Sequence, residues 1–212
     1  MIILHLIATP RAESSNTLRI SNVLLDNIEQ HVPDRHMMTL DLFHHDVPAM
    51  AGNRIESKYI LMRGGELQPD MRTTWDDIES AIHRFLLADI YVVSAPMWNF
   101  TIPYALKYYI DTIVQPGYLF KYKEDGTPIG LATDKKMVVV RTTGGDYSEN
   151  SPLHALDFHE PYLRGIFGFC GITDIHFITA GLMDVTPELR EQRIKQAIEE
   201  QVPVAVNHIL PI

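Results

Sequence analysis

The stretch IYVVSAPMWNFTIPYALKYYID, residues 90–111, contains a complete strand–loop–helix unit. Its first four residues are an apolar run that predicts a buried strand. Pro103 then opens a segment of helical periodicity, since proline is favoured in the first turn of a helix. The loop between them is unusual, because Met97, Trp98 and Phe100 stand where a surface loop is normally polar. These side chains either plug the hydrophobic core or form one wall of a site for a flat, largely apolar ligand.

Strand and helix signals alternate along the rest of the chain. Runs such as IILHLIA and KKMVVVRT are apolar throughout, as expected when helices cover both faces of a parallel sheet. The alternation predicts parallel strands with right-handed crossovers, and hence an α/β three-layer sandwich around a five-stranded parallel sheet. The expected strands are residues 2–8, 36–42, 90–95, 137–142 and 174–179, and the expected helices are residues 16–31, 70–88, 103–114, 158–169 and a last helix from 187 that Pro203 ends or kinks.

Two segments exceed a minimal α/β unit. Residues 47–67 form one excursion from it. Residues 117–131 form the other, where FKYKEDGTPIGL predicts a β-hairpin that turns at Asp125 and Gly126. No internal repeat or long linker divides the chain, so we expect one domain that spans residues 1–212.

Composition narrows the classes of function. The 212 residues include 18 basic and 27 acidic side chains, a formal net charge of -9, which argues against nucleic-acid or anionic-membrane binding. The lone cysteine, Cys170, lies in an apolar segment and is expected to be a small core residue. No apolar run approaches the ~18 residues of a membrane span, and MIILHLIATPR predicts a first strand rather than a signal peptide. We expect a cytoplasmic protein.

The loop after the first strand has the composition of a phosphate site. Ligands of open parallel sheets bind beyond the carboxyl ends of the strands. This loop lacks both the G-x-G-x-x-G pattern and the P-loop pattern. It offers instead the hydroxyls of Thr9, Ser15 and Thr17, the amide of Asn16, and Arg11, beside the free N–H groups that open a helix. The alternative is that Ser15 or Asn16 simply caps that helix.

The loop after the fourth strand, within VVVRTTGGDYS at residues 138–148, contains Gly144 and Gly145. Such glycines either let the backbone approach a ligand or supply positive φ for an ordinary turn. Taken together, the loops after the first, third and fourth strands offer phosphate donors, an apolar wall and backbone amides at one edge of the sheet. A mononucleotide with a flat ring, such as flavin mononucleotide (FMN), fits this set better than a dinucleotide.

These motifs resemble those of the FMN-dependent NADH-azoreductase (NADH:quinone oxidoreductase) family of flavodoxin-like proteins, over nearly the whole chain. The family's Pro-Met-Tyr-Asn-Phe loop is matched by Pro96-Met97-Trp98-Asn99-Phe100, its serine-rich phosphate loop by Thr9, Ser15 and Thr17, and its Ser-x-Gly-Gly loop by Thr142-Thr143-Gly144-Gly145. Residues 120–122, 161–163 and 167–172 match as well. The departures are Trp98 in place of the commoner tyrosine, and threonine in place of serine at 9, 17 and 142.

The resemblance implies a flavodoxin-like sheet of order 2-1-3-4-5. It also implies an enzyme that passes hydride from NADH or NADPH through bound FMN to quinones and aromatic azo compounds by a ping-pong mechanism. The flavin would carry the chemistry, with no metal and no catalytic triad. The alternative is an FMN-binding electron carrier or flavin sensor without its own NADH turnover.

The resemblance further implies a homodimer with active sites at the subunit interface, where the hairpin and an exposed Tyr118 make contacts. Phe120, Tyr147 and Phe169 are expected around the acceptor pocket, or else are ordinary core or interface aromatics. The expected cofactor contacts are Thr9, Arg11, Ser15, Asn16, Thr17, Pro96, Met97, Trp98, Asn99, Phe100, Thr142, Thr143, Gly144, Gly145 and Tyr147.

Overall fold

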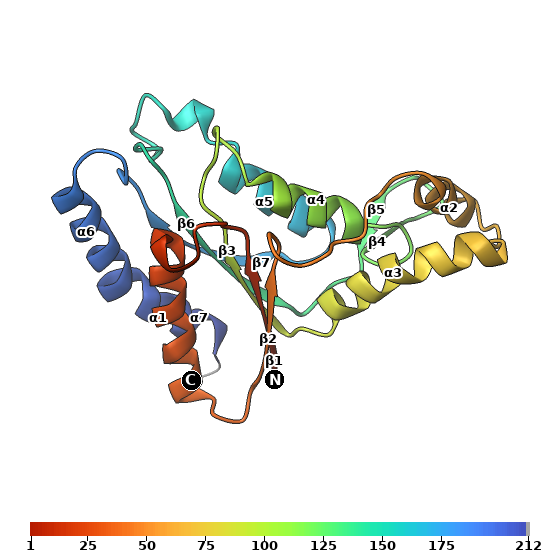
Figure 1. Cartoon of the computed structure of the whole chain (residues 1–212), viewed down its shortest axis with the longest axis horizontal. Coiled ribbons are helices and arrows are strands. Elements are labelled where there is room, and N and C mark those ends of the chain that lie inside the picture. Colours follow the sequence, from red (N-terminus) through yellow and green to blue (C-terminus); the bar gives the residue numbers. More distant parts are fainter. Residues whose placement is uncertain (211–212) are drawn as a thin grey trace.

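A computed structural model describes residues 1–210, and its main sheet has five parallel strands in the order β2-β1-β3-β6-β7 (Figure 1). The predicted parallel sheet is confirmed, and so is the order 2-1-3-4-5 once the two hairpin strands are left out of the count. The order reverses between β1 and β3, which places the switch point there. The strands are β1 (Ile2–Ile7), β2 (His36–Asp41), β3 (Ile90–Ser94), β6 (Lys136–Thr142) and β7 (Asp174–Ala180).

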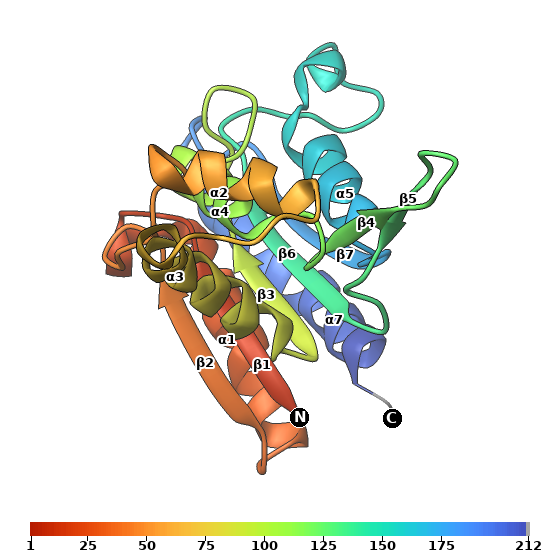
Figure 2. The ribbon, with the colours of Figure 1, turned by 90° about the vertical axis from the view of Figure 1, so that its right-hand side faces the viewer.

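Helices cover both faces of the sheet, as Figures 1 and 2 show. Successive strand residues point to opposite faces, so Val92 packs in one core cluster while Tyr91 and Val93 pack in the other. One face carries α1 (Asn16–His31), α6 (Pro187–Gln196) and α7 (Val202–Ile209), and the other carries α3 (Pro69–Leu86), α4 (Tyr104–Ile113) and α5 (His159–Phe169).

Both expected excursions are present. The segment 47–67 contains α2 (Asn53–Met62). The segment 117–131 contains the predicted antiparallel hairpin, β4 (Phe120–Tyr122) and β5 (Pro128–Gly130), in which Gly126 has a φ of 81°. Figure 2 shows this hairpin beside α5. Two short 3-10 turns, η1 (Ala12–Ser14) and η2 (His154–Leu156), complete the elements of the loops.

The last helix passes Pro203 instead of ending there. α6 continues through a π-helical turn, η3 (Ala197–Gln201), into α7, and Pro203 lies in the first turn of α7, where its missing N–H costs least. The wider turn brings Gln201 to edge strand β7, where its amide nitrogen donates to Thr179 O at 3.0 Å and its oxygen accepts from Thr179 N at 2.8 Å. Within residues 1–210, no helix combines the length and apolarity needed to cross a bilayer.

Candidate functional site

A polar cavity of about 370 Å³ lies at the carboxyl ends of β1, β3 and β6. Its wall is built by the same three loops that the sequence analysis selected. The predicted residues that line it are Thr9, Arg11, Ser15, Asn16, Thr17, Pro96, Met97, Trp98, Thr142, Thr143 and Gly144.

The hydroxyl groups near the start of α1 are arranged as donors to the cavity. Ser15 Oγ accepts a hydrogen bond from Leu18 N at 3.3 Å, and Thr9 Oγ1 accepts one from Arg11 N at 3.4 Å. A hydroxyl that accepts from the protein keeps its own hydrogen for another acceptor. The capping role of Ser15 is therefore confirmed, and it is compatible with an anion at the free N–H groups of the first helical turn.

Two threonines join the first and third loops. The hydroxyl oxygens of Thr17, in α1, and Thr142, at the end of β6, lie 2.7 Å apart and both residues are buried. Because one hydroxyl donates to the other, the pair retains one hydrogen for an outside acceptor.

The loop at residues 96–101 is a tight turn held against β6. Met97 N donates to Thr142 O at 2.9 Å, and Trp98 exchanges two backbone hydrogen bonds with Thr101, at 2.8 and 3.0 Å. Asn99 and Phe100 lie between them with φ of 47° and 72°. Positive φ at both central residues defines a type I′ turn, and it is uncommon for a bulky residue such as phenylalanine. The amides of Met97 and Trp98 therefore donate within the protein, whereas those of Asn99 and Phe100 are left for a ligand.

The aromatic side chains of this loop do not plug the core. Phe100 is 42% exposed, and Met97 and Trp98 are partly exposed. The Trp98 ring packs against Phe43 and Tyr104, with centroid distances of 5.8 and 6.4 Å. Trp98 also borders a second, mostly apolar groove of about 610 Å³ over α4. The interpretation that these side chains fill the hydrophobic core is therefore wrong. The loop instead forms a wall between the polar cavity and the apolar groove.

Three further cavity residues, absent from the prediction, follow β7: Met183, Asp184 and Arg190. The loop after β7 reaches the site because Met183 N donates to Thr143 O at 3.0 Å and Asp184 N donates to Gly144 O at 3.3 Å. A Cβ atom on Gly144 would overlap the Asp184 carboxylate, so this glycine serves a close approach and does not supply positive φ. The sequence contained one signal for these residues: they follow the carboxyl end of a strand, the edge of the sheet at which ligands bind.

Four predicted cofactor contacts lie beside the cavity instead of on its wall: Asn99, Phe100, Gly145 and Tyr147. The Tyr147 and Phe100 rings meet edge to face at 6.5 Å. Tyr147 also lines a neighbouring polar cavity of about 460 Å³ between β7 and α6. Gly145 O accepts hydrogen bonds from Thr143 Oγ1 and Leu182 N, which fix the third loop.

Two of the three residues predicted for the acceptor pocket are far from the cavity within one chain. Phe120 and Phe169 contact each other, with ring centroids 4.6 Å apart. They lie at the C-terminal end of α5, whereas its first residue, His159, bonds to Ala95 O at the carboxyl end of β3. The 11 residues of α5 separate these ends by about 15 Å. Tyr147 is at the cavity end.

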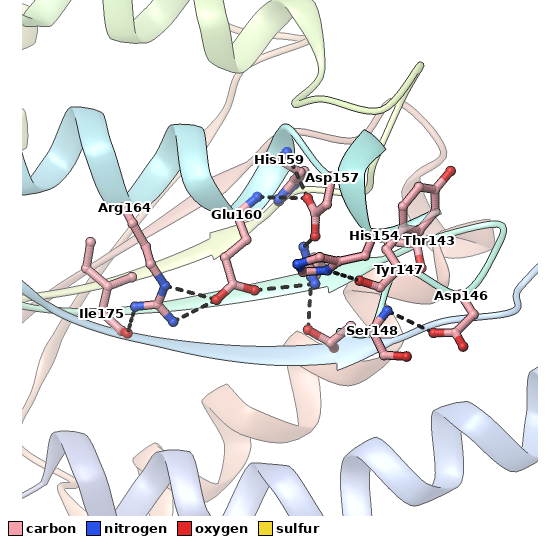
Figure 3. Close-up of polar contacts among 12 residues, drawn as sticks. Thr143, Asp146, Tyr147, Ser148, His154, Asp157, His159, Glu160, Arg164 and Ile175 are labelled. Atoms are coloured by element: carbon pink, nitrogen blue, oxygen red, sulfur yellow. Dashed lines mark hydrogen bonds and ion pairs between the residues drawn. The ribbon is translucent and has the colours of Figure 1, made fainter. Parts of the chain in front are cut away.

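An ion-pair network centred on Arg141 adjoins the third loop, and Figure 3 labels two of its carboxylates, Asp157 and Glu160. The Arg141 side chain is 7% exposed and lies 2.6 Å from Asp157 Oδ2, 3.3 Å from Glu160 Oε2 and 3.0 Å from Thr179 Oγ1. Burial acts to raise the pKa of Asp157, but the hydrogen bond and charge of Arg141 outweigh it, so the pKa is lowered. Asp157 is thus ionised at neutral pH and holds Arg141, the residue next to Thr142, in place.

Metal-binding geometry is not part of this site. Among residues 1–210, no group of three His, Cys, Asp or Glu side chains is placed to hold a metal ion. The thiol of Cys170 is buried, and burial raises its pKa to about 12, so it is a weak nucleophile.

The comparisons with known proteins agree with this architecture. Residues 1–202 match the family described by its flavodoxin-like fold. An FMN-dependent NADH:quinone oxidoreductase of Rhizobium meliloti is 38% identical over 199 residues, which cover 93% of each chain. A protein of that name from Nitratidesulfovibrio vulgaris is 34% identical over 200 residues, 92% of this chain and 95% of the relative.

Solved structures give the same result. The crystal structure of an FMN-dependent NADH-azoreductase from Bacillus anthracis in complex with FMN has a TM-score of 0.83 and 25% identity, and the match covers 97% of this chain and 99% of that one. The chain belongs to the flavodoxin-like family of FMN-dependent NADH:quinone oxidoreductases.

Proposed function

We propose that this protein is an FMN-dependent enzyme that oxidises NADH and reduces quinones and aromatic azo compounds. The observation that carries the proposal is one cavity in which three loops place hydroxyl donors at one end and an aromatic turn at the other. The names of the relatives, which specify FMN and NADH, support it. When bound, FMN supplies the two-electron chemistry in two half-reactions, one with each substrate.

The residues at the start of α1 fit the phosphate of FMN. Thr9 and Ser15 each have a hydroxyl hydrogen to donate, and the first turn of α1 adds backbone N–H groups. Arg11 and Arg190 contribute positive charge to the cavity wall, and Arg190 is held there by its Nε–H, which donates to Met183 O at 2.6 Å. These two cations outweigh the single carboxylate of Asp184, so the cavity favours an anion.

The loops after β3 and β6 fit the flavin ring. The amides of Asn99 and Phe100 are those that the turn leaves for a ligand, and further amides come from Gly144, on the cavity wall, and from Gly145 beside it. Preorganised N–H groups stabilise negative charge that develops on a bound ring, without the cost of reorientation. The indole of Trp98 supplies an aromatic wall. We expect these chain atoms to hold and polarise the ring, with no side chain that transfers a proton.

We further propose a homodimer that completes the acceptor pocket. Phe169, which is partly exposed, reaches a cavity only if it belongs to a second copy, because about 15 Å of α5 separates it from its own. Phe120 is 8% exposed and packs against Phe169, so it supports that side chain from the core. Exposed aromatic residues near the cavity support such a contact: Tyr104 is 70% exposed and Phe158 55%. Tyr118, expected on the surface, is half-buried and donates a hydrogen bond to Glu79. Sedimentation of a monomer at micromolar concentration would contradict the dimer.

We also propose a reducing, cytoplasmic setting, which the lone, buried thiol of Cys170 supports. NADPH remains an alternative donor, to be compared with NADH in the same assay.

The purified protein tests the proposed function directly. We expect a yellow preparation whose visible absorbance bleaches when NADH is added without air. Continuous NADH oxidation on addition of 1,4-benzoquinone would distinguish an enzyme from an electron carrier or a sensor, because neither of those turns over NADH unaided. A colourless preparation that does not bind added FMN would contradict the whole assignment.

A further inference from the structure

A second cavity, of about 400 Å³, lies between α3, α4 and the loop that follows β2. It shares no lining residue with the proposed cofactor cavity. Its volume lies within the range of small-molecule sites in proteins. One part of its wall is apolar (Leu40, Val47, Pro48 and Ala81), and the rest carries the polar residues His45, Asp46, Arg54, Asp77, Ser80, Arg84 and Tyr109.

The two arginines of this cavity differ in their partners. Arg54 is neutralised by Asp77, whose carboxylate lies 2.6 Å away, and it also donates to two backbone carbonyl oxygens. Arg84 lies 2.8 Å from His45 Nε2, and no carboxylate among residues 1–210 lies within 4.0 Å of its nitrogens. Because a guanidinium can only donate, His45 Nε2 is the acceptor in this contact. Arg84 is thus a cation of the cavity that forms no ion pair with a carboxylate among residues 1–210.

A buried hydroxyl without a partner occupies the same wall. Tyr109 is 1% exposed, and its hydroxyl has no hydrogen-bond partner among residues 1–210. The comparable buried Tyr91 donates to Phe85 O at 2.9 Å. Burial raises the pKa of Tyr109, although the charge of Arg84 opposes this, so the phenol keeps its hydrogen. Buried polar groups in native proteins nearly always have a partner, and an exception calls for an explanation such as an absent ligand.

We propose that this cavity binds a small organic carboxylate. The planar fork of Arg84 matches a carboxylate in two parallel hydrogen bonds. The apolar body of the molecule then lies against Val47, Pro48 and Ala81, and its carboxylate is the acceptor that the Tyr109 hydroxyl lacks. Asp46 and Asp77 on the same wall disfavour a dianion such as phosphate. The carboxylate site does not depend on the proposed flavin chemistry. Either hypothesis can therefore be wrong while the other is right.

Isothermal titration calorimetry of the purified protein, with its cofactor as isolated, tests this site. The probe is cyclohexanecarboxylate, and cyclohexanecarboxamide is the uncharged control of the same shape. We expect the acid to bind at least about tenfold more tightly than the amide, since a charged partner strengthens each hydrogen bond. Arg84→Gln should weaken binding of the acid at least about tenfold, and Arg84→Lys should weaken it less because the charge remains.

The matched control is Arg72→Gln, on the same helix but outside the cavity, where Arg72 pairs with Asp76 and Glu79. We expect this variant to bind the acid as the parent does. Circular dichroism confirms that each variant is folded, which the exposed position of Arg84 favours. Equal affinity of the parent and Arg84→Gln for the acid, equal affinity for acid and amide, or tighter binding of inorganic phosphate than of the acid would each overturn the proposal.

Discussion

His159 Nε2 donates a hydrogen bond to the carbonyl oxygen of Ala95 over 2.9 Å, which ties the start of α5 to the residue before the cofactor loop (Figure 3 shows His159 beside Asp157). His159 is fully buried, and its Nδ1 has no partner among residues 1–210. Burial, reinforced by the charge of Arg141, lowers the pKa of His159 to about 4. At neutral pH this imidazole therefore supports the loop as a neutral group.

Stability should fall as pH falls from 6.5 to about 4. His5 is also buried, which lowers its pKa to about 4 against a weaker effect of Asp41. In that window the unfolded chain binds protons that the folded chain excludes, so the free energy of unfolding decreases with acidification. Each histidine contributes at most roughly 3 kcal/mol. Urea unfolding should be measured at several pH values from 7 to 4. The free energy of unfolding should depend less on pH in His159→Gln than in the parent or in the exposed control His36→Gln. If His159→Gln had the same pH dependence of stability as the parent, His159 would not be a source of the acid destabilisation.

Ser15→Ala should lose both a helix cap and a phosphate donor. Thr186 caps α6 in the same way, since its Oγ1 accepts from Leu189 N at 3.2 Å, and it lies outside the cofactor cavity. Each alanine variant should lose about 1 kcal/mol of stability. Only Ser15→Ala should also weaken FMN binding, as measured by quenching of flavin fluorescence on titration of the apoprotein. Equal FMN affinity in the two variants would exclude Ser15 from the phosphate site.

Thr17→Val and Thr142→Val should have non-additive effects on FMN affinity. One of the two hydroxyls donates to the other, and only the second keeps a hydrogen for FMN. Removal of either hydroxyl therefore changes the acceptor to which the remaining one donates. Residues in one hydrogen-bond network typically couple by 0.5 kcal/mol or more. A double-mutant cycle on FMN dissociation constants measures this coupling, with Thr127→Val in the hairpin as control. Strictly additive effects would show that the two hydroxyls act separately.

Asn99→Val should destabilise the turn that presents its amides. A β-branched residue at φ 47° is strained, with a cost of roughly 1–2 kcal/mol, whereas Asn99→Gly should be tolerated. Asp134 has a φ of 61° far from the cavity, so Asp134→Val is the matched control for strain alone. We expect thermal unfolding to reveal similar losses for both valine variants, and flavin titration to reveal weaker binding only for Asn99→Val.

Arg141→Leu should cost far more stability than loss of an exposed pair. It leaves Asp157 buried without its cation, a change worth roughly 3–5 kcal/mol. Arg19→Leu breaks an exposed pair with Glu191, 2.6 Å apart, and should cost less than about 1 kcal/mol. Adding Asp157→Asn to Arg141→Leu should recover part of the loss, because the unpaired charge is then removed. Chemical denaturation of the three variants measures each value.

The hairpin and the last helix illustrate how far local sequence signals reach. The Asp125–Gly126 pair predicts its turn correctly, because the φ of 81° at Gly126 is a property of that residue and its neighbours. Pro203 is an equally local signal, yet the helix continues past it. The continuation depends on the π-helical turn and on the contact of Gln201 with the edge strand, which involve residues far apart in sequence.

The sequence by itself determined the alternation of strands and helices, their parallel arrangement and the three loops that meet at one edge, since hydrophobic periodicity and strand direction are local properties. Tertiary structure alone decided which residues after β7, Asp184 and Arg190 among them, line the cavity, that Thr17 pairs with Thr142, and that Phe120 lies at the opposite end of α5. Hydrogen bonds and packing between distant segments select these partners, and no periodicity along the chain encodes them.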